Sequence, residues 1–411
     1  MKTTPLDIRP VSSEEFETFL RAGETAFGVH AQTEDIQSWR LVFEPARSLA
    51  AFDGGRIVGT AAAFSLSLTV PGGQLPMPGV TAVGVHPTHR RQGILTSLMR
   101  RQLDDFRDQG EVIAGLWASE GAIYGRFGYG AATNATQIRI ERKYTSFVHA
   151  YERTGRTSLI DKDAALKLFP SLYERVAATY PGMVSRPGDW WRYVTRENEQ
   201  WRGGFSPLFY AIYESPEGEA QGYVMYRVKH DWPADPGEST LKVQELMAET
   251  PDAYAALWRL CFDHDLIDRV EAWPRQADEP LLQLLAHPRE LNLRATDGLW
   301  LRLIDIPRAL AGRKYSSEAD LVFEVADPFC PWNEGRFELR ASADGAAECR
   351  TTDRSPDISL DQRDLAAAYL GGVRFQTLGR AGRVVESTDG TLAAADRVFF
   401  WDPPPWCPHI F

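Results

Sequence analysis

The chain has 411 residues, and at about 150 residues per domain this length predicts two or three domains. A hydrophobic share of 44% and a charged share of 25% are ordinary for a globular protein with real cores. The net charge of −11 disfavours general nucleic-acid binding, which needs a basic face, and it permits attraction of cationic substrates to a carboxylate-lined cleft.

The N-terminal sequence and the cysteine spacing bear on where the protein works. MKTTPLDIRP lacks the apolar core of a signal peptide, and no window of about 18 apolar residues predicts a transmembrane helix. No two cysteines form a C-x-x-C pair, so we expect no zinc site of that type and no metal. These features predict a cytoplasmic protein with free thiols and no membrane insertion. The cysteines are Cys261, Cys330, Cys349 and Cys407.

The first third of the chain alternates helix and strand patterns. Residues 12–27 predict a helix, because a serine start and an early glutamate pair precede apolar residues at helical spacing. Residues 48–70 predict two strands around an Asp-Gly-Gly turn, and the Pro- and Gly-rich residues 71–79 predict a loop. The next predicted elements are a strand, a helix and a strand, at 80–85, 94–110 and 112–119.

The strand and helix patterns recur in the middle third and change in the last third. Three strands and a helix are predicted at 209–214, 222–228, 240–248 and 251–265. The last third predicts an antiparallel sheet from 299–310, 319–327, 335–342 and 346–352, followed by a helix over 361–372 that stops at glycines. This alternation favours an α/β (α+β) fold class.

The segment HPTHRRQGILTSLMRR joins the strand over 80–85 to the next helix. Pro87 ends the strand pairing, and from Ile94 onward the apolar residues fall on one helical face. The free N–H groups and the positive dipole end of that helix make an anion site, and Gly93 lets a phosphate approach the backbone. Arg90 and Arg91 add charge and forked donors suited to phosphate. The junction therefore predicts a pyrophosphate-binding turn.

Other interpretations of this junction explain less of it. An Arg-Arg pair before a helix is usually a solvated basic turn when it stands alone, but here a strand, a proline break, a glycine and a helix accompany it. The Walker pattern G-x-x-x-x-G-K-[ST] is absent, and so is the dinucleotide pattern G-x-G-x-x-G after the first strand.

RRQGIL is similar to the R/Q-x-x-G-x-G/A acetyl-CoA signature of the GNAT acetyltransferase superfamily, with Leu95 where a small residue is usual. With ASEGAIYGRFGYG, the three-part organisation and the aromatic C-terminus, the whole chain resembles the Eis (enhanced intracellular survival) family of aminoglycoside-type N-acetyltransferases. The resemblance implies a catalytic GNAT domain at 1–140, a degenerate GNAT-like domain at 141–292 and a sterol-carrier-protein-like α+β domain at 293–411 that carries the catalytic C-terminus. It also implies a homohexamer built as a trimer of dimers.

The resemblance implies acetyl-CoA as co-substrate and assigns residues to it. The strand Val83, Gly84 and Val85 would pair with the pantetheine arm, as an open strand edge allows. Ser119 and Glu120 would contact the same arm after the next strand. The residues expected around the pyrophosphate are Arg90, Arg91, Gln92, Gly93, Ile94, Leu95 and Thr96.

Acetyl transfer to an amine needs a base for the ammonium proton and an acid for the departing thiolate. SEGAIYGRFGYG follows a strand and predicts a sharp turn with Tyr124 at its edge, and a tyrosine with a pKa of about 10 is a competent acid at neutral pH. On spacing alone, Tyr124 could instead pack against the sheet, as we expect of Phe127 and Tyr129. The resemblance assigns Tyr124 the role of proton donor.

The last residues, RVFFWDPPPWCPHIF, are aromatic and proline-rich where a chain end is normally polar and frayed. Leaving them in water would cost roughly 1.5–3 kcal/mol for each large apolar side chain, so we expect the tail to be packed into the protein. The resemblance implies that the terminal carboxylate of Phe411 is the catalytic base. Simple packing of the tail is the alternative.

The resemblance places the acceptor pocket beside AFGVHAQTEDIQSW. Phe27 and Trp39 match aromatic positions of the family, and Val29 falls where an acidic residue would stand, with Glu34 and Asp35 nearby. Loss of that acid disfavours a polycationic aminoglycoside, and aromatic walls favour lysine-like or arylalkyl amines. The predicted partner is therefore a small-molecule amine.

The second GNAT-like segment reads VQELMAETPDAYAALWRL. It offers Glu245, Glu249 and Asp252 where a phosphate would need arginines, so we expect this domain to bind no CoA and to be structural. Two other functions stay open from the sequence: a CoA-binding scaffold without catalysis, and a lipid-binding protein acting through its C-terminal domain. Tyr124 and Phe411 favour the enzyme.

Overall fold

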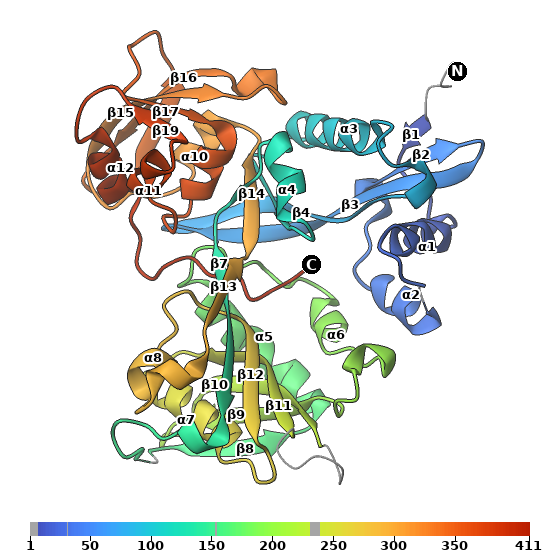
Figure 1. The fold of residues 1–411 in the computed structure, drawn as a ribbon, viewed down its shortest axis with the longest axis vertical. Coiled ribbons are helices and arrows are strands. Elements are labelled where there is room, and N and C mark those ends of the chain that lie inside the picture. The colour runs from blue at the N-terminus through green and yellow to red at the C-terminus, as the bar shows by residue number, and fades with distance from the viewer. Residues whose placement is uncertain (1–6, 31, 153, 231–238) are drawn as a thin grey trace. The chain divides into compact units, whose positions relative to one another are not determined.

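Figure 1 shows the fold in a computed structural model, which describes residues 7–30, 32–152, 154–230 and 239–411. The chain forms two compact units. Unit 1 comprises Met1–Thr133, Leu299–Asp402 and Ile410–Phe411, and unit 2 comprises Asn134–Gly298 and Pro403–His409. Among the described residues, no helix has both the length and the apolar character needed to cross a membrane.

Seven strands form the first sheet of unit 1, in the order β1-β2-β3-β4-β5-β14-β6. The predicted turn between the second and third of them is present, with positive φ at Gly54 and Gly55, a conformation that glycine adopts without strain. The strands are β1 (Asp7–Arg9), β2 (Ser48–Asp53), β3 (Arg56–Val70), β4 (Gly73–Val85), β5 (Ile113–Trp117), β6 (Gly130–Ala131) and β14 (Leu299–Leu303).

Helices cover both faces of this sheet. The predicted helix over 12–27 is α1 (Phe16–Ala26), which lies with α2 (Thr33–Trp39) on one face, while α3 (Ile94–Asp108) lies on the other (Figure 1). Successive side chains of a strand point to opposite faces, so the same strands contribute to a core on each side of the sheet. Ala50 and Ala62 belong to the core on the α1 side, and Ala51 and Ala61 belong to the core on the α3 side.

The predicted loop over 71–79 is wrong, because β4 already begins at Gly73 and only Pro71 and Gly72 form the turn. Pro76 and Pro78 lie inside this strand, opposite β3. β4 pairs with β5 only at Gly79 and Val80, so the edge beside the two prolines is open and their missing N–H groups break no ladder.

The prediction for the segment 299–310 holds for its first half, which is an antiparallel strand, but it is wrong about the sheet that this strand joins and about the second half. Its first half is β14, which lies between β5 and β6 in the first sheet, and its second half is the helix α9 (Ile306–Ala311). The Asp305 side chain accepts a hydrogen bond from the Arg308 N–H at 3.0 Å and so begins this helix. An apolar run does not reveal which strands it will pair with.

The second sheet of unit 1 has the order β17-β16-β15-β18-β19. The predicted antiparallel pairing holds for β15, β16 and β17, but β15 and β18 are parallel, because the chain crosses over before this short strand. The elements are β15 (Ala319–Ala326), β16 (Gly335–Ala341), β17 (Ala347–Thr351), β18 (Ile358–Asp361), β19 (Val384–Glu386), α10 (Gln362–Ala368), α11 (Phe375–Arg380) and α12 (Thr391–Phe399). The predicted helix over 361–372 is α10.

Unit 2 has one seven-stranded sheet, in the order β13-β7-β12-β11-β10-β9-β8. Its predicted strands and helix are confirmed as β9, β10, β11 and α7. The elements are β7 (Asn134–Glu141), β8 (Arg156–Ile160), β9 (Phe209–Glu214), β10 (Ala220–Lys229), β11 (Thr240–Ala248), β12 (Arg269–Arg275), β13 (Arg294–Asp297), α5 (Lys162–Ala177), α6 (Trp190–Val194), α7 (Pro251–Phe262) and α8 (Leu281–Leu284). Trp406 of the tail packs into the core on the α5 side.

Candidate active site

In unit 1, β4 and β5 separate after two paired positions. They pair at Gly79 with Gly115 and at Val80 with Leu116, and then diverge. A bulge in β4 lies opposite Ala61 of β3, and Ala82 within it has a φ of 49°. The Thr60 hydroxyl holds the bulge by donating to the Ala82 carbonyl at 2.8 Å. The result is a gap between β4 and β5, here called the fork, along which β4 has an open edge.

The predicted phosphate turn follows β4 directly. A 3-10 turn at Pro87–His89 leads into Arg91 with a φ of 63° and Gly93 with a φ of 83°, after which α3 begins at Ile94. The predicted helix start is therefore confirmed. Because the first N–H groups of α3 have no partner inside the helix, they and the helix dipole favour an anion here.

The start of the turn is held by polar contacts. The Thr88 hydroxyl lies 2.8 Å from Nδ1 of both His86 and His89, and His89 Nε2 lies 3.2 Å from an Asp53 oxygen. Burial and the nearby Arg56 guanidinium lower the pKa of His86. Through these contacts His89 helps to hold the shape of the turn.

One cavity of about 650 Å³ brings together most of the residues expected around acetyl-CoA. Of the expected residues, its lining contains Phe27, Val83, Gly84, Val85, Arg90, Arg91, Gly93, Ile94, Leu95, Thr96, Ser119, Glu120 and Tyr124. It also contains Ala26, His89, Ile123 and Arg126, which were not assigned to the site from the sequence. Ile123 and Arg126 belong to the same motif as Tyr124, so motif membership could have identified them.

Four expected residues do not line this cavity. Gln92 is exposed, and Val29 is half-buried. Trp39 packs against Phe64, with ring centroids 5.7 Å apart, and the Phe411 ring lies against Gly79. Nothing in the sequence pattern marks Phe64, because it looks like any other core residue of a strand.

Tyr124 ends the short helix α4 (Gly121–Tyr124), and a 3-10 turn at Gly125–Phe127 follows. The motif is thus two short helical turns, not the single sharp turn predicted. Burial raises the pKa of Tyr124 to about 12, against the effect of a hydrogen bond with Ser119, while the Glu120 charge adds to the rise. The phenol therefore holds its proton at neutral pH. Phe127 and Tyr129 are buried in the sheet core as expected.

The arrangement defines what the site can bind. An open strand edge suits an extended amide-bearing chain, and the turn with its two arginines suits a pyrophosphate. A methyl group placed on Gly93 would meet no described heavy atom within 4 Å, so the turn is open to a ligand. A protonated phenol at the same cavity can donate to a leaving group.

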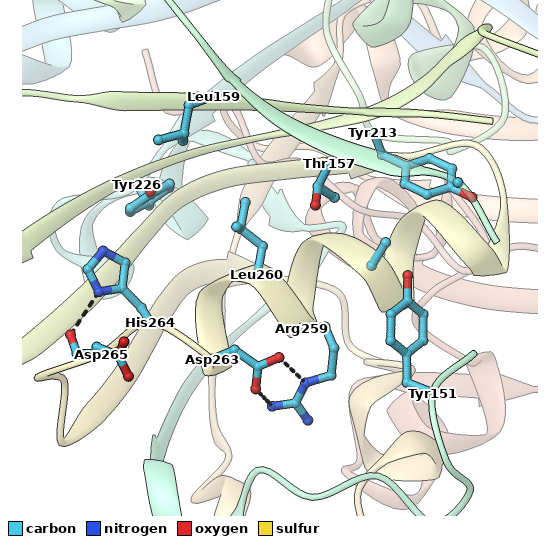
Figure 2. Close-up of a pocket in the computed structure, with 12 residues that line it drawn as sticks. Tyr151, Thr157, Leu159, Tyr213, Tyr226, Arg259, Leu260, Asp263, His264 and Asp265 are labelled. Carbon is cyan, nitrogen blue, oxygen red and sulfur yellow. Dashed lines mark hydrogen bonds and ion pairs between the residues drawn. The ribbon is translucent and has the colours of Figure 1, made fainter. Parts of the chain in front are cut away.

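In unit 2, the strand and helix that correspond to β4 and α3 are β11 and α7, and their junction carries acidic residues instead of arginines. Glu245 is buried in an ion pair with Arg186, Glu249 pairs with Arg175 at 2.6 Å, and Asp252 accepts from Thr154 at 3.0 Å. A cavity of about 400 Å³ lies elsewhere in this unit, between α7 and β8 (Figure 2).

The arginine of that second cavity is already engaged. Arg259 donates to Asp263 at 2.7 and 3.2 Å, as Figure 2 shows, and to the Thr145 carbonyl at 2.7 Å. This agrees with the expectation that unit 2 binds no CoA, which stays a prediction.

Comparison with protein families, sequence relatives and solved structures identifies the family to which the chain belongs. Residues 7–132 and residues 182–303 each match an acetyltransferase (GNAT) domain, and residues 306–408 match a sterol carrier protein domain. The chain is 43% identical to an "uncharacterized N-acetyltransferase" of Streptomyces avermitilis, over 98% of this chain and 99% of the relative. It is 34% identical to N-acetyltransferase Eis of Mycobacterium tuberculosis, over 90% and 91%. The solved structure of Eis1 from Mycobacterium abscessus superposes with a TM-score of 0.84 at 36% identity, covering 98% of this chain and all of that one.

The fold and the site define a GNAT acetyltransferase with a second GNAT domain and a sterol-carrier-protein-like domain, as the sequence predicts. Within that class, the chain belongs to the Eis family and is an N-acetyltransferase. The GNAT fold implies acetyl-CoA as co-substrate and a small-molecule acceptor. The domain boundaries expected at 140/141 and 292/293 stay a prediction.

Proposed function

We propose that this protein transfers the acetyl group of acetyl-CoA directly to a small-molecule amine, with Tyr124 as general acid and the terminal carboxylate of Phe411 as general base. The observation that carries the proposal is the single cavity that joins the open edge of β4, the arginine turn and Tyr124. The resemblance further suggests a homohexamer, a trimer of dimers, working in the cytoplasm.

The proton transfers balance in this scheme. The Phe411 carboxylate takes a proton from the acceptor ammonium, and the amine lone pair forms a bond to the acetyl carbon. The C–S bond breaks, and the Tyr124 phenol gives its proton to the departing sulfur. The nitrogen of the new amide gives its second proton to the Tyr124 phenolate through solvent, which restores the phenol. The Phe411 carboxyl group releases its proton to solvent, so the net products are the amide, CoA thiol and one proton.

The acceptor is expected to be a lysine-like or arylalkyl amine rather than an aminoglycoside. Val29 brings no charge to its half-buried position, and Asp35 is engaged by the Gln32 N–H at 3.3 Å. Phe27 is 52% exposed, and Trp39 and Phe64 are in ring contact, so aromatic side chains are available to an acceptor on this side of the sheet. A panel of aryl, alkyl and polycationic amines, followed by thiol release from acetyl-CoA, tests this. Faster turnover of aminoglycosides than of every arylalkyl amine would contradict it.

Tyr124→Phe tests the acid. The change removes the proton and keeps the ring, so acetyl-CoA affinity should be unchanged while kcat falls about 10²- to 10⁴-fold. Tyr129→Phe is a matched control, because it removes a hydroxyl from a neighbouring buried ring, 6.1 Å away between centroids. A Tyr124→Phe enzyme with full turnover would leave the phenol with packing alone.

A Phe411 carboxamide, made by semisynthesis, tests the base. The amide has nearly the same shape but takes no proton, so kcat at pH 7 should fall while the fold and acetyl-CoA binding persist. Because the free-base fraction of the acceptor grows with pH, the defect should shrink as pH rises toward the amine's own pKa. Wild-type turnover of the carboxamide at pH 7 would rule out this mechanism.

A further inference from the structure

Gly79 lies at the closed end of the fork. It pairs with Gly115 of β5 at the first of the two positions that join the strands. It also pairs with Phe64 of β3, and directly opposed residues on paired strands point to the same face. Phe64 contacts Trp39 of α2 on that face.

The ring of Phe411 fills the place of the missing Gly79 side chain. A methyl group on Gly79 would lie 3.0 Å from Cε2 and 3.2 Å from Cδ2 of Phe411, and 2.7 Å from Cδ1 of Leu66. Such contacts are closer than carbon atoms approach at equilibrium, so Leu66 would have to turn aside and the ring would have to move by a few tenths of an ångström. The ring therefore lies closer to the backbone at this position than a residue with a side chain would allow.

The acid and the chain end belong to opposite faces of this sheet. Tyr124 belongs to the same hydrophobic core cluster as Val80, Leu116 and the α3 residue Met99. Gly79 neighbours Val80 in the strand, so its face is the other one. The fork is the opening in the sheet between them, which suits a reaction whose acid and base approach the thioester from two sides.

We propose that Gly79 is a positioning residue for the reaction: its missing side chain makes a seat for the Phe411 ring, and this seat holds the terminal carboxylate at the fork, on the face that carries Phe64 and Trp39. The proposal rests on the proposed function, since it assigns Gly79 the task of placing the base.

Gly79→Ala tests the seat. We expect kcat to fall roughly tenfold, with KM for acetyl-CoA within about twofold, because about 1 Å of misplacement can cost about a hundredfold and the ring has to move by less than that. Gly73→Ala is the matched control in the same strand, because a methyl group there would meet no described heavy atom within 4 Å. Equal activity of the two variants overturns the proposal.

A double-mutant cycle that combines Gly79→Ala with removal of Phe411 shows whether Gly79 acts through Phe411. In a protein lacking Phe411, Gly79→Ala should cause no further loss of kcat, because the ring that it displaces is gone. An equal loss in the shortened chain would assign the effect to Leu66 or to the strand, and would overturn the proposal. If Gly79→Ala does not fold, Phe411→Ala empties the seat from the other side, and full turnover of that variant also overturns it.

A fluorine label on the Phe411 ring tests the position of the ring independently of the role of the carboxylate as base. With 4-fluorophenylalanine at position 411, the ¹⁹F resonance should shift in Gly79→Ala and stay in place in Gly73→Ala. If it shifts while the Phe411 carboxamide retains full turnover, the seat exists and the base assignment fails. If it does not shift, the seat itself is disproved.

Discussion

Arg90 and Arg91 are adjacent, yet the structure gives them different surroundings. Arg90 donates to the Ala26 carbonyl at 2.9 Å, which ties the phosphate turn to the end of α1. Arg91 lines the cavity from a backbone with a φ of 63°, which a residue other than glycine adopts at some cost. A phosphate bound to the turn would offset that cost.

Arg91→Ala should weaken acetyl-CoA binding by about 1.5–3 kcal/mol, because it removes a charge-assisted hydrogen-bond donor. This corresponds to roughly 10- to 150-fold in Kd, measured by calorimetry. Arg101→Ala is the control, since Arg101 lies on α3 in an ion pair with Asp105. Unchanged affinity in the Arg90/Arg91 double alanine would show that the anion site lies elsewhere.

Sequence reasoning reached the local part of the site and missed the part made by strand pairing. The turn, Gly93 and the start of α3 depend on neighbouring residues and could be predicted. Phe64 and Gly79 gain their significance from being opposite each other across two strands, which no local pattern reveals.

At the scale of elements, β4 shows why composition misled the prediction. Proline and glycine usually mark a loop, but an open edge tolerates proline, and the close packing of Leu66 and Phe411 favours glycine at position 79. The sheet to which β14 belongs was missed for a related reason, since its partners β5 and β6 are far away in the sequence.

β14 also carries a fully buried arginine that shapes the Tyr124 segment. Arg302 pairs with buried Asp327, and a methyl group on Gly128 would lie 1.8 Å from Arg302 Nη1. Gly128→Ala should therefore destabilise unit 1 by about 1–3 kcal/mol more than Gly55→Ala does. Gly55 is a matched control, because its φ of 83° is nearly the same as the 81° of Gly128 and an added methyl group would meet no described heavy atom within 4 Å. Equal shifts in the denaturation midpoint would mean that backbone strain alone is responsible.

At the scale of the whole chain, the tail is packed, as its apolar composition predicts. Trp406 is 2% exposed within unit 2, its backbone N–H donates to the Pro181 carbonyl at 2.8 Å, and its ring centroid lies 5.7 Å from that of Tyr180. The sequence established that the tail docks but not where, because docking depends on surfaces formed by distant residues.

Trp406→Ala should destabilise unit 2 by about 3–5 kcal/mol, since it empties a large buried site. Trp201→Ala, which removes a 62% exposed tryptophan from the same unit, is the control. Hydrogen exchange in α5 and β11 measures the difference. Similar protection in both variants would show that the tail adds little to the core of unit 2.

The place of β14 has a consequence for how the protein is made on the ribosome. When residue 133 has emerged, β5 has no partner on one side, and the strand that will fill the gap to β6 ends only at Leu303. At translation rates of about 5–20 residues per second, this interval lasts roughly 10–30 s. During that time the nascent chain carries an unpaired strand edge, the kind of surface that chaperones cover and that aggregation exploits.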